Sequence, residues 1–111
     1  MSAALFRKLA LALPGAEERA HMGHPDFRVG GKIFATLGYP DDGHGMVALT
    51  RDQQEMMVAA EPAMFKPVKG GWGLKGATNV VLAAADETTL AGALKTAWRN
   101  TAPKALLGEL P

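Results

Sequence analysis

The chain contains no cysteine, and its only serine is Ser2. The absence of cysteine excludes a disulfide framework, a thiolate zinc site and a cysteine nucleophile. Because Ser2 lies at the start of the chain, a serine nucleophile within a catalytic triad is not expected either. A cysteine-free composition fits a reducing compartment, and we predict a cytoplasmic protein.

The sequence also lacks a long hydrophobic run and a strong excess of charge. The longest uncharged apolar run, Val80 to Ala85, is too short to span a bilayer, and the N-terminus does not have the pattern of a secretory signal. We therefore expect no contact with a membrane. Twelve basic and eleven acidic side chains give a net charge of +1, far below the basic excess of a dedicated nucleic-acid protein.

The 111 residues fit a single domain, residues 1–111, with three amphipathic helices. Apolar side chains recur at helical spacing after Ser2 and again after Asp86, and both of these residues are suitable N-caps. A helix between them is predicted to start at Asp52 with a capping-box-like arrangement, and Pro62 ends it. The apolar faces of the first and last helices are the candidate core.

Short alternating or β-branched runs predict strands between these helices. Three strands are expected before the second helix, from the candidate runs at 19–22, 27–29, 32–37 and 46–50, with a turn at 23–26 and a hairpin at Gly30-Gly31. One or two strands follow that helix, and Thr78 to Ala85 is the best of them. The prediction is an α+β fold of the order α-β3-α-β2-α, with an antiparallel sheet covered on one face by helices.

Two patterns resemble known sites without the context that those sites need. Gly71 to Gly76 spells G-x-G-x-x-G, but a strand-like run follows it where a dinucleotide site requires a helix, so a flexible entry into a strand is favoured. His21 and His24 have a metal-pair spacing, yet nothing selects a third ligand from His44 or Asp26. We predict no metal site, no cofactor and no catalytic residues.

Trp72 is the most unusual aromatic residue, because it stands between glycines in a predicted loop flanked by lysines. It is interpreted either as a lid at the end of the core or as a stacking platform for a base or another flat ligand. The segment from Pro62 to Ala85 contains three lysines and no acid. If the Gly30-Gly31 hairpin lies beside that segment, the two form one basic surface; the alternative is ordinary solvated charge. The candidate nucleic-acid-binding residues are Arg28, Lys32, Lys66, Lys69, Trp72 and Lys75.

Several stretches resemble the MmcQ/YjbR-like family. They are His21 to Ala35, Leu13 to Glu18, the Trp72-Gly73 step and Leu94 to Trp98, which together cover most of the chain in order. The resemblance implies an α-β3-α-β2-α fold, described as secretion-chaperone-like or frataxin-like. It brings no catalytic residues. It implies a DNA-binding role through two projecting hairpins, which would correspond here to residues 28–32 and 66–75.

The leading hypothesis is a non-enzymatic domain that binds nucleic acid or a phosphate ligand weakly, as a monomer or weak dimer. The alternative is a protein-interaction module that uses an exposed sheet edge or face. A third possibility is an enzyme whose site is not legible in the sequence. Clustering of the basic residues around Trp72 would favour the first, an exposed apolar patch the second, and a deep pocket with converging polar groups the third.

Overall fold

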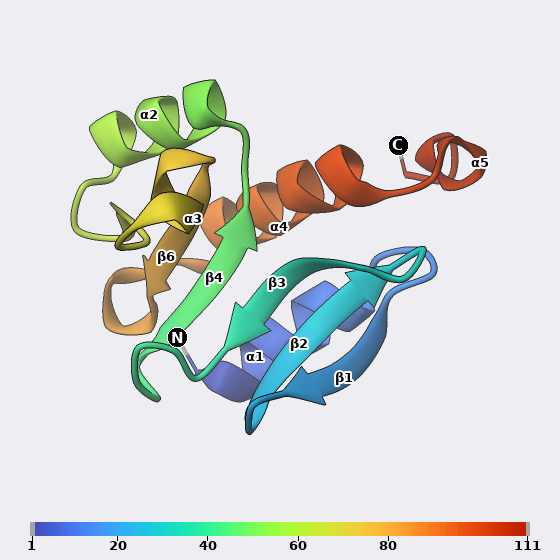
Figure 1. Ribbon diagram of the computed structural model, residues 1–111, viewed down its shortest axis with the longest axis horizontal. Coiled ribbons are helices and arrows are strands. Elements are labelled where there is room, and N and C mark those ends of the chain that lie inside the picture. Colours follow the sequence, from blue (N-terminus) through green and yellow to red (C-terminus); the bar gives the residue numbers. More distant parts are fainter. Residues whose placement is uncertain (1, 111) are drawn as a thin grey trace.

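The computed structural model describes residues 2–110, which form one antiparallel sheet with helices packed around it (Figure 1). The strand order is β1-β2-β3-β4-β6-β5. The strands are β1 (Glu17–His21), β2 (His24–Val29), β3 (Lys32–Leu37), β4 (His44–Ala48), β5 (Phe65–Pro67) and β6 (Ala77–Val81). The helices are α1 (Ala3–Leu11), α2 (Arg51–Ala60), α3 (Gly71–Leu74), α4 (Glu87–Thr101) and α5 (Lys104–Leu107), with a 3-10 turn at Leu82–Ala84.

The predicted α+β class and antiparallel sheet are confirmed, but the predicted number of strands before α2 was wrong. Four strands precede α2, one near each of the four candidate runs, and the first two meet in a turn at Met22-Gly23 and not at residues 23–26. Met22 and Gly23 have φ angles of 50° and 81°, the left-handed conformation of a tight two-residue hairpin turn. Pro25 then lies at the second position of β2, near a strand end, where its missing N–H is tolerated.

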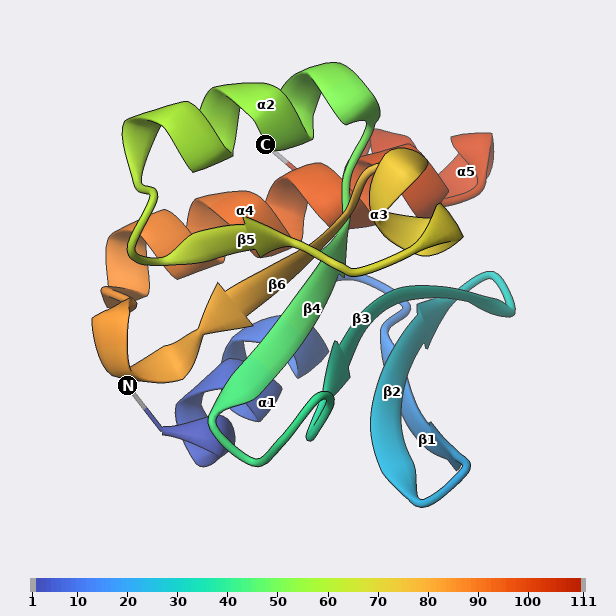
Figure 2. The same ribbon diagram turned by 60° about the vertical axis from the view of Figure 1, so that its left-hand side comes forward.

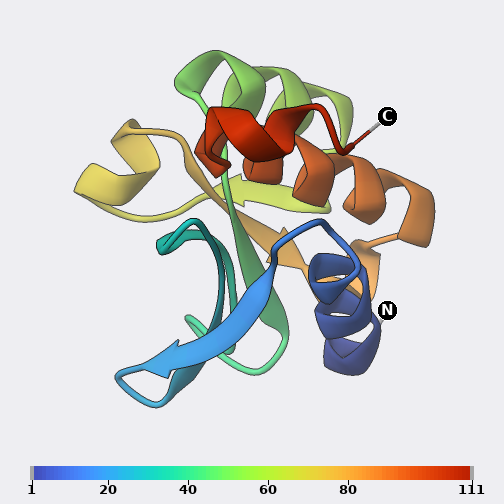
Figure 3. The same cartoon turned by 90° about the vertical axis from the view of Figure 1, so that its right-hand side faces the viewer.

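Helices α1 and α4 cover one face of the sheet, as Figure 3 shows. The apolar stripes predicted for these two helices are buried against it. Phe6, Ala10, Leu90, Leu94 and Trp98 are all at most 1% exposed. The indole of Trp98 donates a hydrogen bond of 2.8 Å to the carbonyl of Pro14, which satisfies its one polar atom. The opposite face of the sheet carries neither of these helices.

A β-bulge in β3 supplies the core with two successive side chains. Phe27 pairs with Ala35, whereas Arg28 pairs with Ile33, so Phe34 is an extra residue in β3. Phe34 and Ala35 are both fully buried, although adjacent residues in a regular strand point to opposite faces. Arg28 and Ile33 therefore share the face that α1 and α4 leave uncovered.

Helix α2 lies along the β5 edge of the sheet (Figure 2). Its N-cap is Thr50, which forms a reciprocal capping box with Gln53, so the predicted start at Asp52 was wrong. The Gln53 and Asn100 side chains hydrogen-bond each other and tie α2 to α4. Among residues 2–110, no helix is long and apolar enough to cross a membrane.

The predicted loop before the last strand contains the one-turn helix α3. The residues after Val81 form a 3-10 turn, so β6 is shorter than the predicted strand at 78–85. The G-x-G-x-x-G pattern serves close packing here. A β-carbon at Gly73 would overlap the carbonyl oxygen of Val68, and one at Gly76 would overlap that of Leu49. Both glycines let α3 pack tightly against its neighbours.

Candidate ligand-binding groove

A groove crosses the uncovered face of the sheet. Its larger hollow has a volume of about 410 Å³ and an adjoining hollow one of about 310 Å³. The two hollows share His21, Thr36, Met46 and Trp72, so they form one continuous groove. The first is also lined by Met22, His24, Tyr39, Val68 and Lys69, and the second by Ile33, Ala48, Leu49, Lys75 and Ala77. These volumes lie within the range of small-molecule sites.

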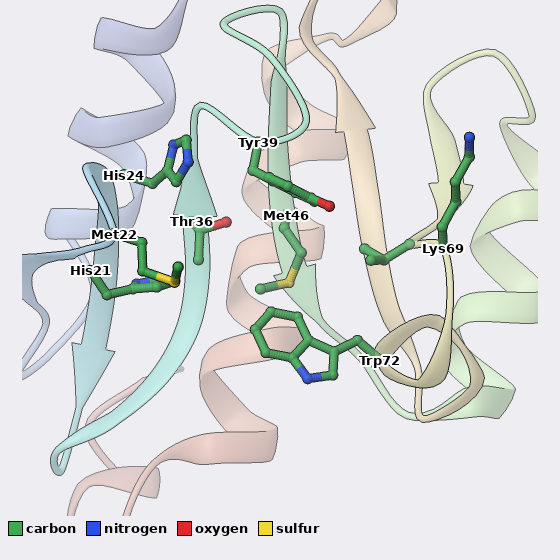
Figure 4. A pocket seen from close by; sticks show the side chains of 9 residues that line it. His21, Met22, His24, Thr36, Tyr39, Met46, Lys69 and Trp72 are labelled. Atoms are coloured by element: carbon green, nitrogen blue, oxygen red, sulfur yellow. The ribbon is translucent and has the colours of Figure 1, made fainter.

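The floor of the groove is formed by Thr36 and Met46 on adjacent strands, and Asp26 continues their row beside it. Asp26 pairs with Thr36 across β2 and β3, and Thr36 pairs with Met46 across β3 and β4. Directly paired residues of antiparallel strands point to the same face, so all three side chains lie on the groove side. Figure 4 shows Thr36 and Met46 between His21, from the β1–β2 hairpin, and Trp72, from α3.

Trp72 forms one wall of the groove. Trp72 is 62% exposed. The interpretation that it covers the end of the core, one of the two drawn from the sequence, was therefore wrong. Helix α3 is anchored from behind, because the Gln54 amide donates hydrogen bonds of 2.9 Å to the Gly73 carbonyl and 3.0 Å to the Ala77 carbonyl. Gln54 itself is buried. The buried Gln54 side chain thus fixes α3, and with it the Trp72 ring, at the groove.

The structure brings together some of the six candidate nucleic-acid-binding residues. Lys69 and Lys75 line the groove together with Trp72. Lys66 lines neither hollow, and its ammonium donates a hydrogen bond of 3.1 Å to the Pro62 carbonyl. Lys32 lines neither hollow, and it pairs with Val29, a core residue, which places it on the helix-facing side.

The two segments expected to form one basic surface are not both at the groove. A β-carbon at Gly30 would overlap the ring of Pro103, so the tip of the β2–β3 hairpin packs against the segment before α5. Arg28 lies on the groove side of the sheet, but its guanidinium is hydrogen-bonded to the Asp26 carboxylate. The spatial cluster at the groove therefore consists of Trp72, Lys69 and Lys75.

Beside the groove, Asp26 connects Arg28 to His21. The Asp26 side chain is fully buried and accepts hydrogen bonds of 2.8 Å and 3.0 Å from the Arg28 guanidinium. His21 Nδ1 lies 2.8 Å from the second oxygen of the same carboxylate. The Arg28 guanidinium holds the pKa of Asp26 below its usual range, and burial opposes this effect only in part. Asp26 is therefore ionised at neutral pH.

An ionised carboxylate only accepts hydrogen bonds, so Nδ1 of His21 must carry the proton that it shares with Asp26. This leaves Nε2 as the atom available to a ligand, and no residue among 2–110 hydrogen-bonds it. His24 lies opposite His21 in the hairpin and lines the same hollow. Within residues 2–110 no group of three metal-ligating side chains occurs.

Large apolar side chains with high exposure surround the groove and α3. Met22 at the hairpin tip is 92% exposed, Tyr39 is 53% exposed and Leu74 on α3 is 69% exposed. The Tyr39 ring makes an edge contact with His24, with ring centres 6.0 Å apart. Apolar side chains clustered around a hollow are typical of binding surfaces.

The sequence alone did not identify His21, Thr36 and Tyr39 as groove residues, and Asp26 was placed in a turn and considered as a metal ligand. His21 reaches the Asp26 carboxylate because the chain turns at Met22-Gly23, and the left-handed conformation of Met22 has no local sequence signal. Thr36 and Tyr39 carried no local signal either, because their place at the groove depends on strand pairing and on the bulge at Phe34.

Comparison with known proteins places the chain in context. A sequence model of the YjbR family matches residues 11–100. A crystal structure of Deinococcus radiodurans protein DR2400, with a DUF419 domain, superposes with a TM-score of 0.75 and 18% identity. The superposition covers 98% of this chain and 87% of that one, and it shows a shared fold. No curated protein matches the sequence.

Proposed function

We propose that this chain, which belongs to the YjbR family, is a non-enzymatic binding domain that takes single-stranded nucleic acid in the groove. The observation that carries the proposal is the exposed indole of Trp72, which forms a groove wall together with two lysines, Lys69 and Lys75. An unpaired base stacks on the indole, and the lysines attract the adjoining phosphates.

Stacking supplies the short-range part of the affinity. Base–aromatic stacking contributes about 1–3 kcal/mol per base and tolerates every base, because each has a flat π-face. Trp72 is suited to this role since its side chain is 62% exposed while α3 is anchored by Gln54. A fixed ring loses little conformational entropy when a base stacks on it.

The lysines supply the long-range, electrostatic part of the affinity. Lys69 and Lys75 belong to the stretch from Pro62 to Ala85, which contains no acid, so no carboxylate of that stretch competes with a phosphate for either lysine. The net charge of the chain is only +1, and two lysines release few counterions. Binding should therefore be weak, on the order of 10⁻⁴ to 10⁻⁶ M at physiological salt.

The size of the groove favours single strands. A hollow of about 410 Å³ has room for a ligand of nucleotide size, whereas a duplex keeps its bases stacked and paired, away from Trp72. Fluorescence anisotropy with labelled single- and double-stranded oligonucleotides at low salt tests this. We expect single strands to bind more tightly, and Trp72→Ala to weaken their binding by about 1–3 kcal/mol.

Leu74→Ala is the matched control for that variant. Leu74 lies on the same short helix and is 69% exposed, but it lines neither hollow, so its loss should leave oligonucleotide affinity unchanged. Binding tightens as salt is lowered, so at low salt about 0.1 mM protein, equal to the weakest Kd expected at physiological salt, should bind a measurable fraction of the oligonucleotide. No detectable binding of either oligonucleotide under these conditions would overturn the proposal.

A second candidate is a protein-interaction module that uses the same face. It is favoured by the exposure of Met22 and Leu74, which a nucleic-acid site does not need. The outer edge strand β1 is a poor surface for strand addition, because Glu17, Glu18 and Arg19 are charged and exposed. A protein partner would thus contact the apolar rim. Its binding would weaken in Leu74→Ala and depend little on salt, the opposite of the pattern expected for nucleic acid.

A further inference from the structure

The end of the groove opposite Trp72 carries the imidazole of His21. His21 lines both hollows, and Thr36 lies on the floor between His21 and Trp72 (Figure 4). The Thr36 side chain is 7% exposed, and no residue among 2–110 hydrogen-bonds its hydroxyl. Besides His24, Tyr39 and the two lysines, the groove therefore presents two polar atoms with spare hydrogen-bonding capacity, Nε2 of His21 and the hydroxyl of Thr36.

The orientation of His21 is fixed by charge. Asp26 is buried and ionised, and it receives two hydrogen bonds from Arg28, so its carboxylate cannot turn away. Its second oxygen holds Nδ1–H of His21 at 2.8 Å. In the neutral imidazole this makes Nε2 an acceptor of hydrogen bonds. Aligning the ring beforehand removes part of the ordering cost that a ligand would otherwise have to overcome.

We propose that His21 is the residue that recognises the polar edge of the ligand: Nε2 accepts a hydrogen bond from a ring N–H of a flat heterocycle in the groove, and Asp26 is its positioning residue. The ligand class is a heterocycle with an N–H donor next to a carbonyl, as in thymine or uracil. The Thr36 hydroxyl donates to that carbonyl. This inference rests on the proposed function, since the heterocycle is the base that stacks on Trp72.

The charged and titratable groups around His21 are compatible with this role. On β1 they are Glu17 and Arg19, which lie on the face of His21 and form an ion pair of 3.6 Å with each other. On β2 they are Asp26, Arg28 and His24, and across the groove they are Lys69 and Lys75, with Tyr39 from the β3–β4 loop. Asp26 is the buried acid among them, and both of its oxygens are already engaged by Arg28 and His21. Of the two imidazoles in this set, His21 and His24, His21 is the one whose ring a buried carboxylate orients, so its Nε2 is the preorganised acceptor for an N–H.

The test compares a short oligothymidylate with the same oligomer built from N3-methylthymidine. Methylation removes the ring N–H and leaves the stacking face and the phosphates in place. For the unaltered protein we expect the methylated oligomer to bind about tenfold more weakly, the effect of one lost hydrogen bond of ordinary strength. His21→Phe should bind both oligomers equally, and His21→Gln, whose side-chain oxygen can accept, should recover part of the preference.

Two further variants separate recognition from folding. Asp26→Asn lets the amide donate to Nδ1, which moves the imidazole proton to Nε2 and removes the acceptor, so the preference should be lost while the methylated oligomer still binds. His44→Phe is the matched control. His44 makes the same kind of pair with Asp41, also at 2.8 Å, but lines neither hollow, so its loss should leave the preference unchanged.

Equal binding of the two oligomers by the unaltered protein, or an undiminished preference in His21→Phe, would overturn the role of His21 and leave the proposed function standing. Binding of neither oligomer would overturn both. A preference that persists in Asp26→Asn, in a protein that folds, would assign recognition to His21 without the positioning by Asp26.

Discussion

The backbone of Gly73 lies against the carbonyl oxygen of Val68 so closely that no side chain fits between them. Gly73 is buried, although its neighbours Trp72 and Leu74 are both exposed. Its own carbonyl accepts the hydrogen bond from Gln54. The contact fixes α3 against the chain that leaves β5, and through α3 it fixes the position of Trp72 at the groove.

Gly73→Ala should therefore displace α3. The added β-carbon would overlap main-chain atoms of Val68, which cannot move aside as the end of a flexible side chain could. We expect a lower melting temperature and weaker oligonucleotide binding. Gly71→Ala is the control, because the same helix has open space at that position and alanine has the higher helix propensity. Equal stability and binding of both variants would contradict the described packing.

Leu94→Ala should destabilise the protein by about 2–5 kcal/mol, the usual cost of truncating a buried leucine. Leu94 is 1% exposed on the sheet-facing side of α4. Lys95→Ala, the exposed neighbour, should change the free energy of unfolding by less than about 0.5 kcal/mol. Urea denaturation of the two variants measures both values, and a loss below about 0.5 kcal/mol for Leu94→Ala would mean that the helix face is misassigned.

The pairing of Asp26 with Arg28 predicts how stability depends on pH. The pKa of Asp26 is lowered in the folded protein, chiefly by the hydrogen bonds from Arg28, so the unfolded chain binds the proton more readily. The stabilisation is fully present above the unfolded value of about 3.9 and is lost as the pH falls through the lower folded value. Asp26→Asn should melt below the unaltered protein at pH 7, and this difference should narrow below about pH 4. A constant difference from pH 7 to pH 2 would contradict the assignment.

The salt dependence of binding tests which lysines contact phosphate. Lys69→Ala and Lys75→Ala should each reduce the log–log slope of affinity against salt by about 1, because each removes one phosphate contact. Lys66→Ala is the control from the same segment, since its ammonium is hydrogen-bonded to Pro62 and lines neither hollow. Equal slopes for all three variants would mean that the charge acts diffusely and not at the groove.

The elements with local signals could be predicted from the sequence. Ser2 and Asp86 cap α1 and α4 as expected, and Gly30-Gly31 forms the predicted hairpin between β2 and β3. Each of these depends on residues within a few positions along the chain. The family resemblance, too, was visible in contiguous stretches of sequence.

The groove could be predicted only in part, because distant contacts create it. Trp72 was identified as unusual, but its glycine neighbours disfavour a helix, and α3 forms because Gln54 satisfies carbonyls nineteen and twenty-three positions away. Asp26 was assigned to a turn, as part of the segment 23–26. Its place in β2 follows from the left-handed Met22, a conformation that methionine rarely adopts and that no local rule predicts.

Intrinsic tryptophan fluorescence tests the central claim most directly. The chain has two tryptophans, and Trp98 is fully buried and hydrogen-bonded to Pro14, so a change on ligand binding reports on Trp72. We predict that single-stranded oligonucleotide quenches the emission saturably at low salt, and that Trp72→Phe abolishes the quenching while Trp98 still fluoresces. Emission that does not change at saturating oligonucleotide, or quenching that persists in Trp72→Phe, would contradict the account.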